Sequence, residues 1–287
     1  MPMAERYSDY NKGLAVTISG VFLLSLDTPL LRLVDGNQWT VMFWRGIFVF
    51  LALGAWWLWR RYSTGNRQSF LKGRWGMFVS LLYGLSNVFF VISLHNTSVA
   101  NLLVILALNP LICALLSLVF LNDKVDIPTW LAIAVSFFGV AIIIQDSFGS
   151  LSFYGDVMAI LAVFTLASAI VFTRKSGLNL TTSPALAGLI AAAVALPFAP
   201  SLILEGSQWG YMAANGIVVM AIAAALLAYA PSLLPAAHVG MFYLLETVLG
   251  PLWVWLAVGE EPSKMAFIGG AIVISTLIVH SVVSFRR

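Results

Sequence analysis

Three charged side chains occur inside stretches of sequence that are otherwise apolar: Asp27, Arg45 and Glu246. A charge within a membrane-spanning helix is costly, so it marks a cavity, an ion pair or a transport pathway. Glu246 lies near the middle of the stretch FYLLETVLGPLW. Its carboxyl group is a candidate for proton coupling or for binding a substrate ammonium group. The alternative is a structural role, in which the buried carboxyl group is bonded to a neighbouring helix.

Asp27 and Arg45 occur at similar depth in the first two apolar stretches. An unpaired charge at that depth is much more costly than a paired one, and we therefore predict a structural ion pair. Two alternatives stay open: a gate that breaks and re-forms during transport, and direct binding of a substrate carboxylate by Arg45.

Polar and aromatic side chains elsewhere in the apolar stretches are candidates for lining a substrate cavity. Tyr83 and Asn87 are four residues apart and therefore lie on one face of a helix. Aromatic rings at depth stack well on planar apolar substrates. The alternative for each residue is ordinary packing or an interhelical hydrogen bond. With Glu246, the candidate cavity residues are Tyr83, Asn87, Asn101, Phe164, His238 and Tyr243.

Prolines inside the apolar stretches predict bends, because proline lacks the N–H group of the helical ladder and clashes with the preceding turn. Candidate hinge residues are Pro29, Pro110, Gly250 and Pro251. Together with Glu246, the Gly250–Pro251 pair predicts a bendable half-helix that carries a polar group at the middle of the membrane. A helix with a merely structural kink is the alternative.

The elements that must position these residues are membrane-spanning helices. Of 287 residues, 61% are hydrophobic and 9% are charged, far from the composition of a soluble domain. A bilayer core about 30 Å thick needs about 20 apolar residues per helix. We therefore predict an all-α integral membrane protein with ten spans and no strands of a β-barrel. The predicted spans are 14–33, 40–59, 76–94, 99–121, 129–145, 154–173, 183–204, 209–229, 237–258 and 265–285.

Several function classes lack their signatures. The sequence has no zinc-site spacing, no P-loop and no dinucleotide-binding glycine fingerprint, and its three histidines are scattered. Cys113 is the single cysteine, so no disulfide can form within the chain. We therefore expect no enzyme activity, no metal, no cofactor and no nucleic-acid partner. The expected partners are a small-molecule substrate and the lipid bilayer, with monomer and homodimer both open.

Basic residues predict the orientation of the chain. The segment RRYSTGNRQSFLKGR after the second span is strongly basic, and placing it in the cytoplasm also places both termini and most of the 15 Lys and Arg residues there. This asymmetry follows the positive-inside rule.

The ten spans divide into two sets of five. A shift of 137 residues lays the region of Ser98 over that of Pro235, so Asp123 falls on Glu260. A shift of 142 residues matches Arg32 to Arg174. Because five is odd, the second half must enter the membrane from the opposite side. We therefore predict two inverted repeats, residues 1–147 and 148–287, around a central cavity.

The ends of the fourth and ninth spans carry a family resemblance. LNPLICALLSLVFLND (108–123) and ETVLGPLWVWLAVGEEPS (246–263) each combine a proline, an apolar run and an acidic residue at the turn. The whole chain resembles the drug/metabolite transporter superfamily with two EamA-type repeats, and is similar to the YddG-type aromatic amino-acid exporters. The sequence departs from the family pattern at Thr247, where a proline is usual.

The resemblance implies a ten-helix secondary transporter in the bacterial cytoplasmic membrane that works by alternating access. The expected substrates are amino acids, aromatic or broad in range, or similar small metabolites. The alternative is a proton-coupled multidrug exporter of lipophilic cations, which Glu246 in an aromatic cavity would suit.

Overall fold

The computed structural model describes residues 3–64, 69–123, 127–147, 152–234 and 236–285, and every regular element within these ranges is a helix. The first half contains α1 (Met3–Leu24), α2 (Asp27–Val34), α3 (Gln38–Ser63), α4 (Gly73–Asn96), α5 (Val99–Leu106), α6 (Asn109–Leu121) and α7 (Ile127–Ser147). The second half contains α8 (Ser152–Ser176), α9 (Ser183–Ala195), η1 (Leu196–Phe198), α10 (Gln208–Ala213), the π-helix η2 (Ala214–Met220), α11 (Ala221–Tyr229), η3 (Ala230–Ser232), α12 (Ala236–Phe242), α13 (Leu244–Val258) and α14 (Lys264–Phe285).

Each of the ten predicted ranges contains helix. Within the part of the chain that the structure describes, six helices are long and apolar enough to cross a membrane, and they begin at Asn11, Gln38, Gly73, Val99, Ser152 and Gln208. The remaining four ranges contain shorter apolar helices. The multi-pass character of the chain follows from these helices, while the count of ten crossings stays a prediction.

Two prolines follow directly on interruptions within a span. The first span breaks at Ser25 and Leu26, and Pro29 lies in the first turn of α2. The fourth span breaks at Ala107 and Leu108, and Pro110 lies in the first turn of α6. The first turn tolerates proline because its N–H group has no intrahelical partner.

The expected bend of the ninth span at Gly250 and Pro251 stays a prediction, and the interruption of the helix lies elsewhere. α13 continues through both residues, and the interruption lies a turn and more earlier, at Tyr243. A Cβ atom added to Gly250 would lie 2.3 Å from Cδ1 of Leu103, so this glycine permits close packing of α13 on α5.

The seventh span is shorter than predicted. Helix continues only to Phe198, whereas the predicted range ran to residue 204. Pro197 and Pro200 supply the reason, since neither has an N–H group to continue the ladder.

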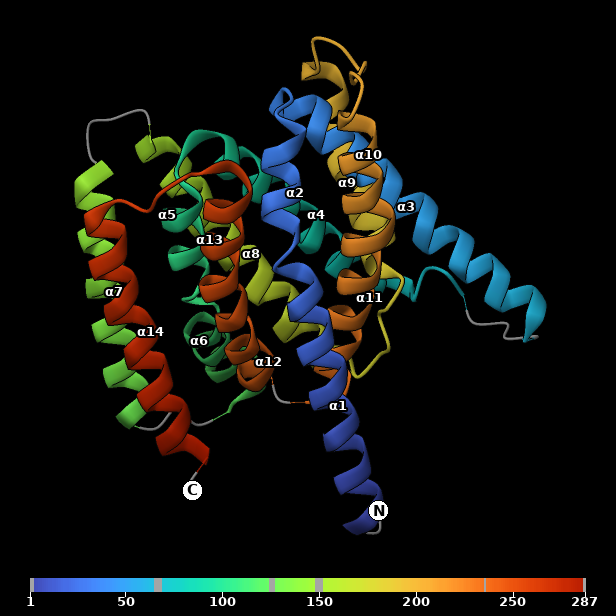
Figure 1. The fold of residues 1–287 in the computed structure, drawn as a ribbon. Coiled ribbons are helices and arrows are strands. Elements are labelled where there is room, and N and C mark those ends of the chain that lie inside the picture. The colour runs from blue at the N-terminus through green and yellow to red at the C-terminus, as the bar shows by residue number, and fades with distance from the viewer. Residues whose placement is uncertain (1–2, 65–68, 124–126, 148–151, 235, 286–287) are drawn as a thin grey trace.

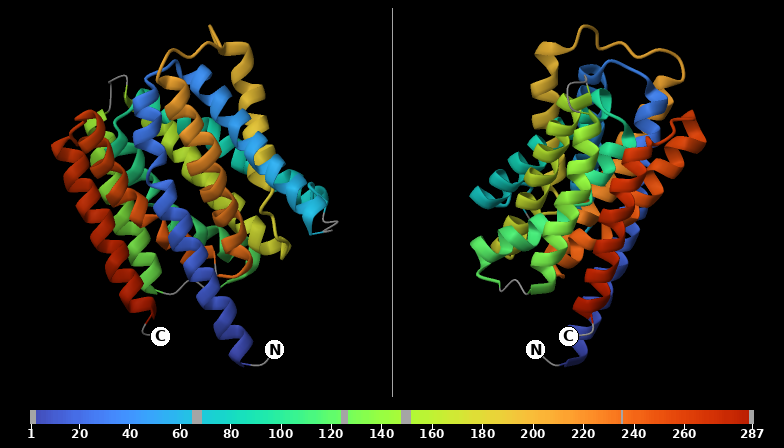
Figure 2. Two further views of the ribbon diagram at one scale, coloured as in Figure 1. Left: turned by 45° about the vertical axis from the view of Figure 1, so that its right-hand side comes forward. Right: turned by 90° about the vertical axis from the view of Figure 1, so that its left-hand side faces the viewer.

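The helices form a bundle in which α1 begins and α14 ends at the same end (Figures 1 and 2). α3 packs on α9, α4 packs on α8, and α7 packs on α14 at one edge of the bundle (Figure 1). α5 lies in the core, and all eight of its residues are buried.

Two glycines set the contact between α3 and α9. A Cβ atom added to Gly46 would lie 2.2 Å from the backbone oxygen of Gly188, and one added to Gly188 would lie 2.6 Å from the backbone oxygen of Gly46. The two backbones therefore touch at this point, an approach that only small residues allow.

Candidate functional site

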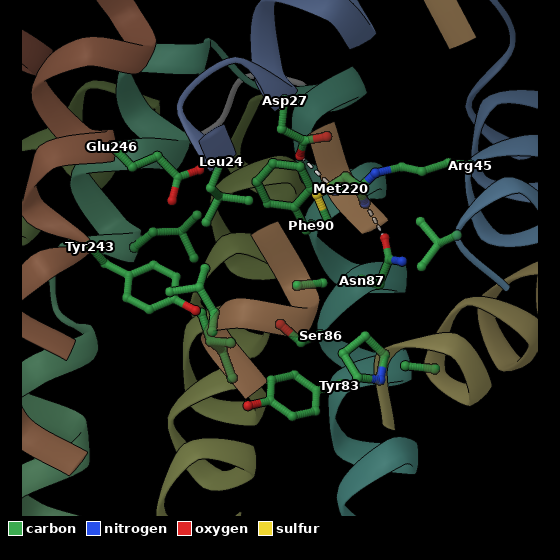
Figure 3. A pocket seen from close by; sticks show the side chains of 17 residues that line it. Leu24, Asp27, Arg45, Tyr83, Ser86, Asn87, Phe90, Met220, Tyr243 and Glu246 are labelled. Carbon is green, nitrogen blue, oxygen red and sulfur yellow. Dashed lines mark hydrogen bonds and ion pairs between the residues drawn. The ribbon is translucent and has the colours of Figure 1, made fainter. Parts of the chain in front are cut away.

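A cavity of about 120 Å³ lies at the centre of the bundle (Figure 3). Its lining comes from both halves of the chain and is mostly apolar, with a few polar groups, as is usual for small-molecule sites. It extends from the level of Asp27 and Arg45 to Pro184 in the first turn of α9, toward the end where α1, α4 and α9 begin. The lining residues are Leu24, Asp27, Arg45, Val49, Tyr83, Ser86, Asn87, Phe90, Leu106, Leu166, Pro184, Ala187, Met220, Ala224, Leu227, Tyr243 and Glu246.

A buried polar network forms one end of this cavity. Arg45 Nη2 donates to Asp27 Oδ2 at 2.6 Å, and Arg45 Nη1 donates to Asn87 Oδ1. Asn215 Nδ2 donates to the other carboxylate oxygen of Asp27 at 2.7 Å. The guanidinium group also lies over the ring of Phe90, 5.3 Å from its centroid. The predicted partners Asp27 and Arg45 are thus 1% and 3% exposed and paired with each other.

Helix geometry explains why α4 contributes so much of the wall. Tyr83, Ser86, Asn87 and Phe90 recur at spacings of three and four residues, which places them on one face of α4. The hydroxyl group of Ser86 donates to the backbone oxygen of Ala162 at 3.0 Å and so ties this face to α8.

Glu246 lies across the cavity from Arg45 (Figure 3). It is 4% exposed, and no hydrogen bond or ion pair identified among the described residues engages its carboxylate. Tyr243, one turn earlier, brings a ring to the same wall. The neighbouring Thr247 turns away and contacts the backbone oxygen of Leu103 at 3.2 Å. The cavity therefore has a paired cation on one side and a carboxyl group without an ion partner on the other.

Two candidate cavity residues, Phe164 and Asn101, do not line this cavity in the described structure. Phe164 is 51% exposed on α8, so its ring faces the surroundings of the bundle rather than the interior. Asn101 is buried in the first turn of α5, where its backbone N–H group donates to Ser98 Oγ at 3.1 Å. The side chain of His238 falls outside the described residues.

The two ends of the bundle each carry an ion pair. At the end opposite the termini, Arg32 Nε lies 3.1 Å from Glu260 Oε2, and Glu260 also accepts a bond from the backbone N–H group of Val99 at 2.8 Å. Arg32 further donates to the backbone oxygen of Thr97, whose hydroxyl group donates to Asp156 at 2.6 Å.

The ion pair at the other end is simpler. Arg174 Nη1 lies 3.3 Å from Asp123 Oδ2, and both side chains are more exposed than those of Arg32 and Glu260. The ion pair at the end with Arg32 is therefore the less exposed of the two.

Comparison with known proteins identifies the family. The model of the EamA-like transporter family matches residues 11–145 and again residues 153–282. The chain belongs to the EamA-like transporter family. No curated protein in the comparison matches it, while 21 solved chains do. One of them, described only as the crystal structure of a protein, is 19% identical, has a TM-score of 0.72, and covers 97% of this EamA-like transporter and 100% of its own chain.

Membership of the EamA-like transporter family establishes the general function of the protein. EamA-like transporters are membrane transporters rather than enzymes, which implies a small-molecule substrate and a lipid environment. Among the described residues, no group of three or more His, Cys, Asp or Glu side chains is placed to hold a metal ion.

The sequence interpretation of this EamA-like transporter missed several residues of the site. Asn215 is fully buried in the network and lies in the first turn of the π-helix η2, a feature frequent at functional sites. Asn87 was selected because it is a polar residue within an apolar stretch, and the same criterion would have selected Asn215. Phe90 and Met220 gave no comparable signal, since nothing in their type distinguishes them from lipid-facing neighbours.

Proposed function

We propose that this EamA-like transporter exports amino acids or similar small zwitterionic metabolites across the bacterial cytoplasmic membrane by alternating access. The observation that carries the proposal is the placement of Glu246 opposite Arg45 across one cavity, with the rings of Tyr83, Phe90 and Tyr243 at its wall. A carboxylate suits the ammonium group of an amino acid, and a guanidinium group suits its carboxylate. The aromatic rings suit an apolar or planar side chain.

Charge balance favours a second candidate, a proton-coupled exporter of lipophilic cations. Arg45 is already neutralised by Asp27, so Glu246 is the charge of the cavity that has no ion partner. A cation would need this carboxylate alone, whereas a zwitterion needs Arg45 to exchange part of its bonding with Asp27 or Asn87 for the substrate.

Counterflow into liposomes separates the two candidates. Liposomes that contain the purified protein are loaded with an unlabelled amino-acid mixture or with an unlabelled lipophilic cation, and uptake of the labelled compound is measured. Accumulation of amino acids supports the first candidate, and the ranking of aromatic over aliphatic ones tests the similarity to YddG-type exporters. Accumulation of the cation alone would replace it with the second.

Glu246→Gln is expected to weaken the apparent affinity in counterflow at least tenfold. The change keeps the shape of the side chain but removes a charge-assisted hydrogen bond worth about 1.5–3 kcal/mol. Glu261→Gln makes the same chemical change at an exposed position and serves as the control. Equal affinities in the two variants would exclude Glu246 from substrate binding.

The transport mechanism that we propose rests on two inverted five-helix repeats, residues 1–147 and 148–287. The support is reciprocal contacts. A shift of 142 residues carries Gly46 to Gly188, which touch each other, and carries Phe48 to Ile190. Phe48 packs against Gly216 in η2, and Ile190 packs against Gly84 in α4, so these two contacts correspond at the level of helices rather than of single residues. Helix packing shows the same correspondence between the two halves. The contacts of α8 with α4 and α6 correspond to the contacts of α1 with α11 and of α2 with α13.

The ion pairs at the two ends also exchange under this relation. Arg32 corresponds to Arg174 and Glu260 corresponds to Asp123, so each pair is the counterpart of the other. We assign them as reciprocal gates, with the Arg32–Glu260 end outside and the termini in the cytoplasm, as the basic loops predict. In the described conformation the Arg32–Glu260 pair is the less exposed of the two, and the cavity extends toward the end with the termini, which supports this assignment.

Arg32→Gln or Glu260→Gln is expected to raise exposure of the cavity to the outside about two- to fivefold, because a partly exposed ion pair contributes up to about 1 kcal/mol. In these variants Ser86→Cys reports the exposure through its labelling rate with a membrane-impermeant maleimide. The native Cys113 is fully buried and gives little background. Lys264→Gln, an exposed change near the same end, is the control. Labelling that does not distinguish these variants would refute the gate assignment.

A further inference from the structure

A second and larger hollow lies on the side of the bundle, between α1, α3 and α11. Its volume is about 730 Å³, and it forms where α3 leans away from α1 and α11 (Figures 1 and 2). We refer to it as the lateral groove. Along α11 and the helix before it, its lining extends from Ile217 to Tyr229, which is about 18 Å at 1.5 Å per residue.

The lateral groove is separate from the central cavity. The two share no lining residue. Between them lies a small apolar cluster whose buried members are Val49, Leu53, Ala185 and Ala221. Whatever occupies the groove therefore does not contact Glu246 or Arg45 in this conformation, and the inference holds whichever substrate the transporter carries.

One end of the groove is basic. Lys12 and Arg60 line it, and a small adjoining cleft shares Arg60 and adds Arg61 and Lys72. Neither lining contains an Asp or Glu residue. The three ion pairs found among the described residues use none of Lys12, Arg60 and Arg61. Lys12, Arg60 and Arg61 thus have no acidic partner among the described residues, and a ligand that neutralises them must be an anion.

The rest of the groove is apolar and open toward the surroundings of the bundle. Ile217 and Ile222 on its wall are each 46% exposed, in a protein whose flank faces hydrocarbon. The length of about 18 Å is close to one half of a hydrocarbon core about 30 Å thick. The groove therefore has the dimensions of a single leaflet, with its charged end at the interface.

We propose that the lateral groove and the adjoining cleft bind one anionic phospholipid. The headgroup phosphate lies between Lys12 and Arg60, with Arg61 and Lys72 beside it, and an acyl chain lies along Leu53, Ala221 and Ile222. Basic pockets between membrane helices on the cytoplasmic side are the usual place for such headgroups. Phosphate offers Arg60 the bidentate hydrogen bonds that a guanidinium group makes well.

The experiment is native mass spectrometry of the purified full chain with equimolar phosphatidylglycerol and phosphatidylcholine. We expect phosphatidylglycerol to be retained at least tenfold more strongly. In Lys12→Gln/Arg60→Gln this preference is expected to be lost, because each basic side chain near the surface contributes about fivefold and the two together account for a preference above tenfold. Arg74→Gln removes an exposed charge outside both linings and is expected to change nothing.

A second variant keeps every charge and fills the groove. Ala55 lines it and is exposed, so Ala55→Phe is expected to displace the acyl chain without disturbing the core. Ala271→Phe places the same ring on an exposed part of α14 and is the control. Equal retention of the two lipids, or an equal effect of each variant and its control, would overturn the proposal. Displacement of the lipid by inorganic phosphate would assign the basic cleft to free phosphate instead.

Discussion

Arg45→Met is expected to lower the free energy of unfolding by about 3–5 kcal/mol, the usual cost of removing one partner from a buried ion pair. Asp27 would remain 1% exposed, with the amide of Asn215 as its main partner. An amide donates a hydrogen bond but cannot neutralise the carboxylate. Methionine preserves most of the volume of the arginine stem, so a cavity contributes little to the expected loss. The measurement is the melting temperature of the purified protein in detergent.

The double variant Asp27→Asn/Arg45→Met distinguishes lost pairing from lost packing. It removes both charges and leaves an amide beside Asn215, so we expect it to recover most of the stability that the single variant loses. Arg61→Met makes the same change at an exposed site of the same helix and should be nearly neutral. A double variant no more stable than Arg45→Met would show that the pair itself is not what stabilises the site.

Gly46→Ala is expected to destabilise the protein by about 1–3 kcal/mol, as overpacking of a tight contact does. The added methyl group would lie 2.2 Å from the backbone oxygen of Gly188, and a backbone atom cannot rotate away as the end of a side chain can. α3 and α9 must separate to accept it. The same measurement of melting temperature applies.

The control for this variant lies on the same helix. Gly54 has no atom within 4 Å of an added Cβ, so Gly54→Ala should be neutral or stabilising by up to about 1 kcal/mol from helix propensity. Gly188→Ala should resemble Gly46→Ala, and the double variant should cost less than the sum, since both enlarge one contact. Equal melting temperatures for Gly46→Ala and Gly54→Ala would contradict the close approach of the two helices.

The placement of the helices was readable from the sequence because the bilayer fixes the length of an apolar run. The pairing of Asp27 with Arg45 was readable for a related reason: two opposite charges at one depth in an apolar medium have a strong reason to meet. Both expectations rest on large free energies, which leave few alternatives.

The orientation of aromatic residues was not readable in the same way. Phe164 was expected in the cavity and is exposed, while Phe90 was overlooked and lies beneath Arg45. In a membrane protein, lipid and protein interior are both apolar, so hydrophobic periodicity does not separate the inner face of a helix from the outer one. Only contacts between distant segments determine which face of a helix lies inside, such as the hydrogen bond from Asn215 to Asp27, 188 residues earlier.

The break in the ninth span shows a different limit of prediction from the sequence. Proline chemistry predicted a bend at Pro251, whereas the helix is interrupted at Tyr243. A shift of 137 residues carries the break of the fourth span, at Ala107 and Leu108, to within about one residue of this position. The fourth span has its proline just after the break and the ninth does not, so the position of the break follows the duplicated architecture rather than the local proline.

The contact between Gly46 and Gly188 has a consequence for motion. When two inverted halves exchange conformations, each contact at one end of the molecule is replaced by its counterpart at the other end. A contact between a residue and its own counterpart, such as Gly46 with Gly188, is the same contact before and after the exchange. In the mechanism that we propose, the point where α3 touches α9 is therefore the pivot about which the two halves rock, and the backbones of Gly46 and Gly188 stay in contact there.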